Sequence, residues 1–211
     1  MPDIKGLNRR KAVLVCISGA EKAKLNKREL NMESKIFGGK KVIIRKVTKL
    51  DIKNAKRFQD FINSLVEEDA KILRNKKATL KDEKDFLEKA IKCAKEENRV
   101  YLIAECGGKI IGTTDIELDR WRRNHIGKFG IAIVHGYRGM GLGKYLMSEV
   151  IKLGKKELKP QPKIVQLEVY ANNKPAISLY KKIGFKIVAK MPKQIQWKGK
   201  LVSEYTMLKY I

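Results

Sequence analysis

One segment of the chain has the residue types of an anion-binding loop. From His135 to Lys156 the sequence reads HGYRGMGLGKYLMSEVIKLGKK, in which four glycines precede an amphipathic helical stretch. The first backbone N–H groups of a helix lack intrahelical partners, and the helix dipole adds a partial positive charge there. Glycine lets a phosphate approach the backbone without a Cβ clash. The segment therefore predicts a strand-to-helix turn that can bind a phosphate group.

Two common phosphate-binding motifs do not fit this segment. A nucleotide-binding P-loop requires Lys followed by Ser or Thr, but Tyr145 follows Lys144. A dinucleotide fingerprint requires G-x-G-x-x-G, whereas the glycines here alternate. The spacing is Arg138-x-x-Gly141-x-Gly143. Taken alone, this spacing also fits a tight turn that binds no ligand.

A second segment, LEVYANNKPAISLYKKIGF from Leu167 to Phe185, favours a ligand-binding loop over a turn that binds no ligand. Together the two segments resemble the GNAT superfamily, the acetyl-CoA-dependent N-acetyltransferases. The matching pieces are Arg138-x-x-Gly141-x-Gly143, the L-x-V-x-x-x-N-x-x-A run that begins at Leu167, and LYKKIGF, which ends at Phe185. The resemblance extends over about 41–210. It implies that the strand before the glycines and the strand after the helix splay apart, with acetyl-CoA between them.

The resemblance also implies the coenzyme contacts. The pyrophosphate would bind main-chain amides of the glycine segment, and the amide-rich arm would pair with the open edge of 130–134. A main-chain N–H near Ile133 would polarise the thioester carbonyl; losing such a donor costs about 3–4 kcal/mol in enzymes. The predicted coenzyme-binding residues are Ile131, Ala132, Ile133, Arg138, Gly139, Met140, Gly141, Leu142, Gly143, Lys144, Asn173 and Tyr180.

Two proton transfers need side chains. An amine acceptor with a pKa of about 10.4 must lose a proton, and the thiolate leaving group must gain one. Tyr180 stands where the family often has its general acid; the alternative is a core aromatic. Glu168 resembles the base of ribosomal-protein alanine acetyltransferases, and strand alternation places Leu167 and Val169 on the opposite face. The alternative for Glu168 is a surface carboxylate paired with a lysine.

Other carboxylates compete for these roles. In TTDIELD, Asp115 and Glu117 alternate onto one face of a predicted strand, and Ile116 lies on the other. This acidic face predicts a binding surface for a cationic amine, or else a solvated face with no ligand. His125 and an ordered water are further candidates for the base.

Hydrophobic periodicity predicts an α/β fold with a mixed sheet of about seven strands. The resemblance implies that this fold is of the GNAT type, with helices on both faces and a splayed central pair. Asp51 is the predicted N-cap of the first helix, and Gly107-Gly108 a hairpin turn. Residues 41–211 form the predicted domain. Residues 1–40 form an extension of uncertain structure, in which VLVCI is either a strand or part of a basic arm. A polar connection is expected between the last two strands. The predicted strands are 40–47, 100–105, 109–119, 128–134, 163–170, 185–191 and 201–210, and the predicted helices are 51–68, 80–97, 142–156 and 175–183.

The formal net charge is +25, from 48 basic and 23 acidic residues among 211. Such a charge is typical of proteins with polyanionic partners such as the ribosome, or of a lysine-rich composition without any partner. The alternative function is therefore a basic ribosome- or RNA-binding module on a degenerate GNAT fold. The sequence favours the enzyme because the glycine segment is intact.

The cysteines, histidines and apolar runs bear on metal binding and on cellular location. The three cysteines form no C-x-x-C pair, and the two histidines lack ligand spacing, so no metal is expected. No apolar run is long enough to span a bilayer, and no cleavable leader is apparent, which predicts a cytoplasmic protein. The sequence leaves open whether the protein is a monomer or a homodimer. The expected reaction is direct attack by a primary amine on acetyl-CoA in a ternary complex. The amine belongs to a protein N-terminus, an amino-acid-like small molecule or a polyamine.

Overall fold

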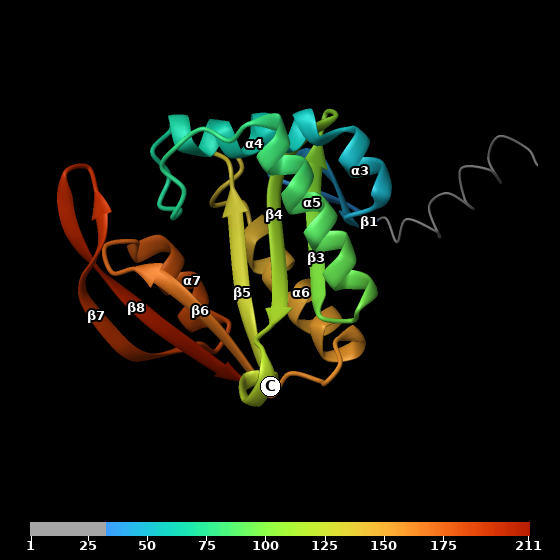
Figure 1. Ribbon diagram of the computed structural model, residues 1–211. Helices are drawn as coiled ribbons and strands as arrows, with labels where there is room; N and C mark the ends of the chain where they lie inside the picture. The colour runs from blue at the N-terminus through green and yellow to red at the C-terminus, as the bar shows by residue number, and fades with distance from the viewer. Residues whose placement is uncertain (1–32) are drawn as a thin grey trace, which may run out of the picture.

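The computed structural model describes residues 33–211, so the VLVCI segment and Cys16 lie outside the described residues. A single sheet runs through the described chain, with helices on both sides (Figure 1). Its strands are β1 Glu33–Phe37, β2 Lys40–Lys46, β3 Arg99–Cys106, β4 Lys109–Leu118, β5 Ile126–Ile133, β6 Ile164–Tyr170, β7 Lys186–Trp197 and β8 Lys200–Tyr210. The helices are α3 Lys49–Lys53, α4 Ala55–Glu67, α5 Leu80–Lys95, α6 Leu142–Glu157 and α7 Lys174–Lys182, with a 3-10 turn η1 at Trp121–Arg123.

The strand order is β1-β2-β3-β4-β5-β6-β8-β7, and every pair is antiparallel except β5–β6. This parallel pair is joined only from Ile126 to Lys128 on β5 and from Ile164 to Gln166 on β6. Beyond Lys128 the two strands diverge, as Figure 1 shows between the yellow β5 and the orange β6. The predicted splayed central pair is therefore confirmed.

Alternation along the strands divides the core into two layers. Val100 and Leu102 of β3 face one side of the sheet, where they join a cluster that includes residues of α6 and α7. Tyr101 and Ile103 face the other side and join a cluster with residues of α4 and α5. The prediction of helices on both faces is confirmed, and α6 and α7 together cover the side opposite α4 and α5.

Three details differ from the sequence prediction. The sheet has eight strands because β1, from the segment left unplaced, pairs with β2. The polar stretch expected as a connection belongs to β7, because the backbone pairs with β8 again from Ile195 to Trp197 after a register shift that follows Met191. Asp51 is not an N-cap: Thr48 takes that position, and the Asp51 carboxylate accepts the Thr48 backbone N–H at 2.8 Å.

Candidate active site

The glycine segment forms the loop between β5 and α6. Gly139 and Gly141 have φ values of +78° and +89°, and a Cβ added at either would meet no atom within 4 Å. These positions require glycine for their backbone conformation, and the space beside them is open. The backbone N–H of Tyr145 donates to the Gly141 carbonyl at 3.1 Å and begins the α6 ladder. The amides of Leu142 to Lys144 therefore have no intrahelical partner and can bind an anion.

Gly143 has a different role from its neighbours. A Cβ at this position would lie 3.2 Å from the Leu179 side chain of α7 and 3.4 Å from the Ile133 side chain of β5. Glycine is needed here because α6, α7 and β5 approach one another closely. The alternating glycines thus combine two needs, a left-handed backbone at two positions and tight packing at the third.

The edge of β5 beyond Lys128 is open toward β6. The backbone N–H of Val134 donates to the Ile111 carbonyl at 3.0 Å, on the β4 side. Because successive residues of a strand direct their peptide groups to opposite sides, the peptide groups of Ile133 and Ile131 point into the gap. Ile131, Ala132 and Ile133 are only half-buried although β5 is central in the sheet. This edge can pair with an extended, amide-containing ligand.

Arg138 reaches from the glycine loop to this edge. Its Nε donates to the Ile133 carbonyl at 2.7 Å, and its guanidinium forms an ion pair with Glu68, which follows α4. The Glu68 carboxylate also accepts the backbone N–H of His135 at 3.2 Å. Glu68 was not identified from the sequence, because the residues that it contacts lie about seventy positions away along the chain. The prediction that Arg138 contacts the coenzyme stays a prediction.

Tyr180 lies on α7 beside the same gap. Its side chain is buried, with ring centroids 6.3 Å from Phe129 and 6.2 Å from Phe185. Burial raises the pKa of Tyr180 to about 12, so the phenol keeps its proton at neutral pH and can donate it. The side chain is thus a core aromatic, and its position remains compatible with the predicted acid.

Asn173 occupies the N-cap position of α7. Its backbone carbonyl accepts the N–H of Ile177 at 3.0 Å, while its side chain makes no capping hydrogen bond. The backbone thus performs the capping role and leaves the amide side chain available. Its predicted coenzyme contact remains a prediction.

Glu168 lies on the opposite face of the sheet from Tyr180. It is exposed on β6 opposite Thr206 of β8, while Leu167 and Val169 are buried, as the alternation predicts. Among the residues that the structure describes, Glu168 has no ion-pair partner, so the expected lysine is not observed. Burial, and then the charge of Glu168, raise the pKa of Glu204 on β8. Sequence reasoning missed Glu204 because the pairing of β6 with β8 carries no local signal.

Asp115 and Glu117 lie on the same face of the sheet, across β5 from Glu168. The guanidinium of Arg99 on β3 pairs with both, at 2.8 Å to Asp115 and 3.2 Å to Glu117, and the Arg99 side chain is only 7% exposed. A Cβ on Gly130 would lie 2.8 Å from the Asp115 carboxylate, so Gly130 leaves the space that this carboxylate fills. Burial raises the pKa of Asp115 to about 6 although Arg99 opposes the shift. The acidic face is part of an ion cluster, and its predicted contact with the acceptor is untested.

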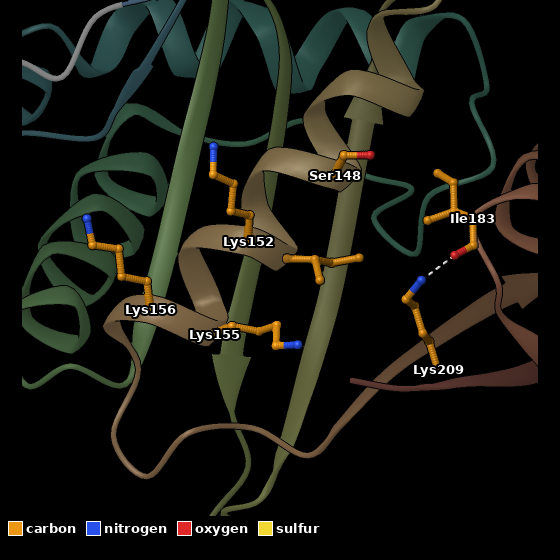
Figure 2. A pocket seen from close by; sticks show the side chains of 7 residues that line it. Ser148, Lys152, Lys155, Lys156, Ile183 and Lys209 are labelled. Atoms are coloured by element: carbon orange, nitrogen blue, oxygen red, sulfur yellow. Dashed lines mark hydrogen bonds between the residues drawn. The ribbon is translucent and has the colours of Figure 1, made fainter.

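One cavity adjoins the acidic face of β4, and a second lies against α6. The first, of about 380 Å³, is lined by Asp115, Glu117, Leu118, Asp119, Arg120, Lys128, Phe129 and Gly130. A larger one of about 520 Å³ is lined by Ser148, Ile151, Lys152, Lys155, Lys156, Ile183 and Lys209 (Figure 2). Three of the four lysines that line the larger cavity have a structural explanation. Lys209 donates to the carbonyl of Ile183 at the end of α7, as Figure 2 shows, and Lys155 and Lys156 lie in the last turn of α6.

Between residues 33 and 211, no group of three or more His, Cys, Asp or Glu side chains could hold a metal ion. Within the same part of the chain, no helix is long and apolar enough to cross a membrane.

Comparison with known proteins adds independent evidence. The sequence profile of the family described as "Acetyltransferase (GNAT) family" matches residues 62–185, more than half of the chain. An L-amino acid N-acetyltransferase of Escherichia coli is 33% identical over 107 residues, which are 50% of this chain and 65% of that protein. An N-alpha-acetyltransferase of Sulfurisphaera tokodaii is 31% identical over 106 residues, 44% of this chain and 60% of that protein. The chain thus matches less than two thirds of either relative.

Among solved structures, a GNAT-family acetyltransferase of Streptococcus pneumoniae superposes with a TM-score of 0.70 at 29% sequence identity. The match covers 81% of this chain and 99% of that one. The similarity therefore extends through the sheet and both helix layers, beyond the loop that carries the sequence motif.

Proposed function

The chain belongs to the GNAT family of acetyltransferases, and from this premise we propose that it transfers an acetyl group from acetyl-CoA to an α-amino group. One observation carries the proposal. The open edge of β5 ends in a loop whose amides from Leu142 to Lys144 lack helix partners, so a gap for a thioester arm leads to an anion site. Acetyl-CoA has both parts, a diphosphate and an amide-containing arm.

The chain's own residues fit this co-substrate. The open space beside Gly139 and Gly141 leaves room for phosphate oxygens near the loop amides. The peptide groups of Ile131 and Ile133 offer donors and acceptors in strand geometry to the arm. When bound, acetyl-CoA supplies the activated acetyl group, and the N–H of Ile133 is the donor placed to polarise its carbonyl.

Glu168 removes the proton from the acceptor amine in this proposal. A cationic amine needs a nearby carboxylate, both to be attracted to the site and to lose its proton before attack. Glu168 has no cationic partner among the described residues, and Glu204 beside it adds a second negative charge. These two carboxylates can therefore accept a cation, whereas Asp115 and Glu117 already share Arg99.

Tyr180 returns a proton to the leaving thiolate. Its raised pKa keeps the phenol protonated at neutral pH, and Phe129, against which it packs, is the first β5 residue beyond the β5–β6 pairing. Glu168 and Tyr180 lie on opposite faces of the sheet. The proposed base and the proposed acid therefore stand on opposite sides of the gap.

The acceptor class follows from the two relatives and the site. One relative is named for L-amino acids and the other for N-alpha acetylation, so an α-amino group is common to both. A free amino acid and a protein N-terminus share this group. A polyamine does not have it, and is the least favoured acceptor.

An acetyl-transfer screen tests the proposal. Purified protein with acetyl-CoA is offered the free amino acids, short peptides with unblocked N-termini, and spermidine, and products are read by mass spectrometry. We expect acetylation on an α-amine. Release of coenzyme A without any acetylated amine would contradict the proposal, and so would acetylation confined to spermidine.

A matched pair of variants locates the coenzyme site. Gly141→Glu places a carboxylate beside the predicted phosphates at a position with φ +89°, and should abolish acetyl-CoA binding in a thermal-shift assay. Gly108→Glu, in the β3–β4 turn with φ +75° and equally open surroundings, imposes a similar strain and charge elsewhere. If both variants bind acetyl-CoA normally, the glycine loop is not the site. Salt-sensitive RNA binding without any acetyl-CoA response would instead favour the RNA-binding alternative.

A further inference from the structure

A short segment connects the two sides of the gap at its wide end. We call residues Glu68–Ile72, which follow α4, the strap. At its first residue the strap binds the glycine loop, through the His135 amide and the Arg138 guanidinium. Toward its last residue the Ile72 carbonyl accepts the hydroxyl of Tyr170, at the end of β6, at 2.7 Å. The strap therefore spans from the loop that follows β5 to the end of β6.

Further contacts fix the strap on the β6 side. Lys71 donates to the Asn172 carbonyl at 3.0 Å. The Asp69 carbonyl accepts the indole N–H of Trp197 at 3.3 Å, and its carboxylate pairs with Lys198 at 3.3 Å, both at the turn of the β7–β8 hairpin. On the β5 side, by contrast, the contacts of the strap with the glycine loop converge on the Glu68 carboxylate.

Arg138 links this carboxylate to the edge that the co-substrate needs. Its guanidinium is shared between Glu68 and the Ile133 carbonyl, which points into the gap. An arm that pairs with β5 competes with Arg138 for this carbonyl. If the arm displaces Arg138 from this carbonyl, Glu68 is the acceptor that remains for Arg138 among the described residues, so the guanidinium stays tied to the strap.

We propose that Glu68 is a positioning residue that transmits binding of the coenzyme to the strap and so orders the wall of the acceptor site. The proposal rests on the proposed acetyl transfer in the β5–β6 gap. Coupling of this kind is reciprocal, because a ligand that orders the strap lowers the ordering cost for the second ligand. It predicts that the acceptor binds more tightly after the coenzyme, and that this preference depends on Glu68.

Hydrogen exchange of the full chain, with and without coenzyme A, tests the coupling. In the wild type, coenzyme A should slow exchange in the glycine loop (residues 133–144) and in the strap, by about fivefold or more in the strap. In Glu68→Gln, which keeps the size of the side chain but removes its charge, the loop should still respond and the strap should not. Glu68→Asp, which keeps the charge, should retain part of the strap response.

Glu67→Gln is the matched control, because Glu67 is the preceding residue and pairs with Lys77 instead of the loop. It should behave as the wild type. In steady-state kinetics, Glu68→Gln should raise the acceptor KM about fivefold with little change in kcat, which general loss of stability would not produce.

The outcomes separate this proposal from the proposed function. If the loop responds to coenzyme A but the wild-type strap does not, or the strap responds equally in Glu68→Gln, the positioning role is overturned and acetyl transfer stands. If coenzyme A changes neither region in the wild type, the coenzyme site itself is wrong, and both proposals fall.

Discussion

Two pairs of carboxylates flank the gap on the same face of the sheet, and their surroundings differ. Asp115 and Glu117 on β4 share the buried guanidinium of Arg99, which also lies 5.0 Å from the ring centroid of Phe86. Glu168 and Glu204 on β6 and β8 have no ion-pair partner among the described residues, and the charge of one raises the pKa of the other. In the first pair, beneath α5, one guanidinium compensates one of the two carboxylate charges, whereas the second pair is an uncompensated negative surface.

The comparison shows that residue type and strand alternation do not decide which carboxylate can act on a substrate. Both pairs alternate correctly onto the gap face, and both lie in a strongly basic protein. What separates them is a single arginine on a neighbouring strand. A carboxylate already paired must give up its partner before it can bind a cation, whereas an unpaired one gives up only water.

The largest expected effect comes from removing the partner of the first pair. Arg99→Leu leaves Asp115 and Glu117 as two adjacent, uncompensated carboxylates, one of them largely buried. Loss of one member of a buried ion pair costs about 3–5 kcal/mol, so the free energy of unfolding in urea should fall by that amount. Arg123→Leu, which removes an exposed arginine paired with Asp119, is the control and should cost under about 1 kcal/mol. If both variants lost the same free energy of unfolding, the buried Arg99 ion pairs would stabilise the fold no more than an exposed pair does.

The next largest effect is expected at Glu168, which makes no ion pair in the described structure. Glu168→Gln should lower kcat about a hundredfold or more, because the glutamine cannot take the proton of the acceptor amine. Folding should be unaffected, since the side chain is exposed and makes no ion pair in the described structure. Glu88→Gln, an exposed glutamate on α5, controls for loss of one surface charge. If Glu117→Gln lowered kcat more than Glu168→Gln does, the carboxylate that acts on the acceptor would lie on β4 instead of β6.

Much of this arrangement could be predicted from the sequence, because its signals are local. Gly139 and Gly141 precede the helix that they start, the alternation around Glu168 is correct, and Gly107-Gly108 makes the expected hairpin turn with φ values of +55° and +75°. Each of these features depends on backbone conformations that a few neighbouring residues determine.

The position of Arg99 could not be predicted, because it depends on a bulge. A regular hairpin around Gly107-Gly108 would place Arg99 opposite Ile116 and turn it away from the carboxylates. The register instead shifts by one residue between Ala104 and Glu105, so that Arg99 lies opposite Glu117. A register shift of one residue exchanges the two faces of a strand. No residue in VYLIAECGGKIIG indicates that such a shift occurs.

β1, the extension of β7 and the contacts of Glu68 were missed for a related reason. β1 joins the sheet through its backbone pairing with β2, and its side chains are mostly exposed, so no hydrophobic alternation marks it. β7 is likewise exposed at most positions. Strands held by main-chain pairing at a sheet edge leave little trace in the side-chain pattern.

A smaller effect on the paired side is the pH dependence of stability. The Asp115 carboxyl has an ordinary pKa of 3.8, which folding raises to about 6, so the folded chain binds more protons between these values. The free energy of unfolding that Asp115 contributes should therefore fall as the pH rises from 3.8 to 6, by about 2 kcal/mol. Comparing the wild type with Asp115→Asn by urea unfolding at several pH values isolates this change. Asp119, whose pKa is lowered chiefly by the backbone N–H of Arg120, should show the opposite slope, losing its contribution as the pH falls.

The smallest effect tests whether Glu168 and Glu204 are electrostatic neighbours. Burial and then the charge of Glu168 raise the pKa of Glu204 above its ordinary value, so Glu168→Gln should lower this pKa. Some elevation should remain, because burial is the larger cause. The titration is followed by NMR of the side-chain carboxyl carbons, assigned with Glu204→Gln. Glu117→Gln should leave the Glu204 titration unchanged, since Arg99 already compensates that charge across β5. If the Glu204 titration is unchanged in Glu168→Gln, the two charges do not act on one acceptor. The proposal that Glu168 and Glu204 together bind the cationic amine would then be wrong.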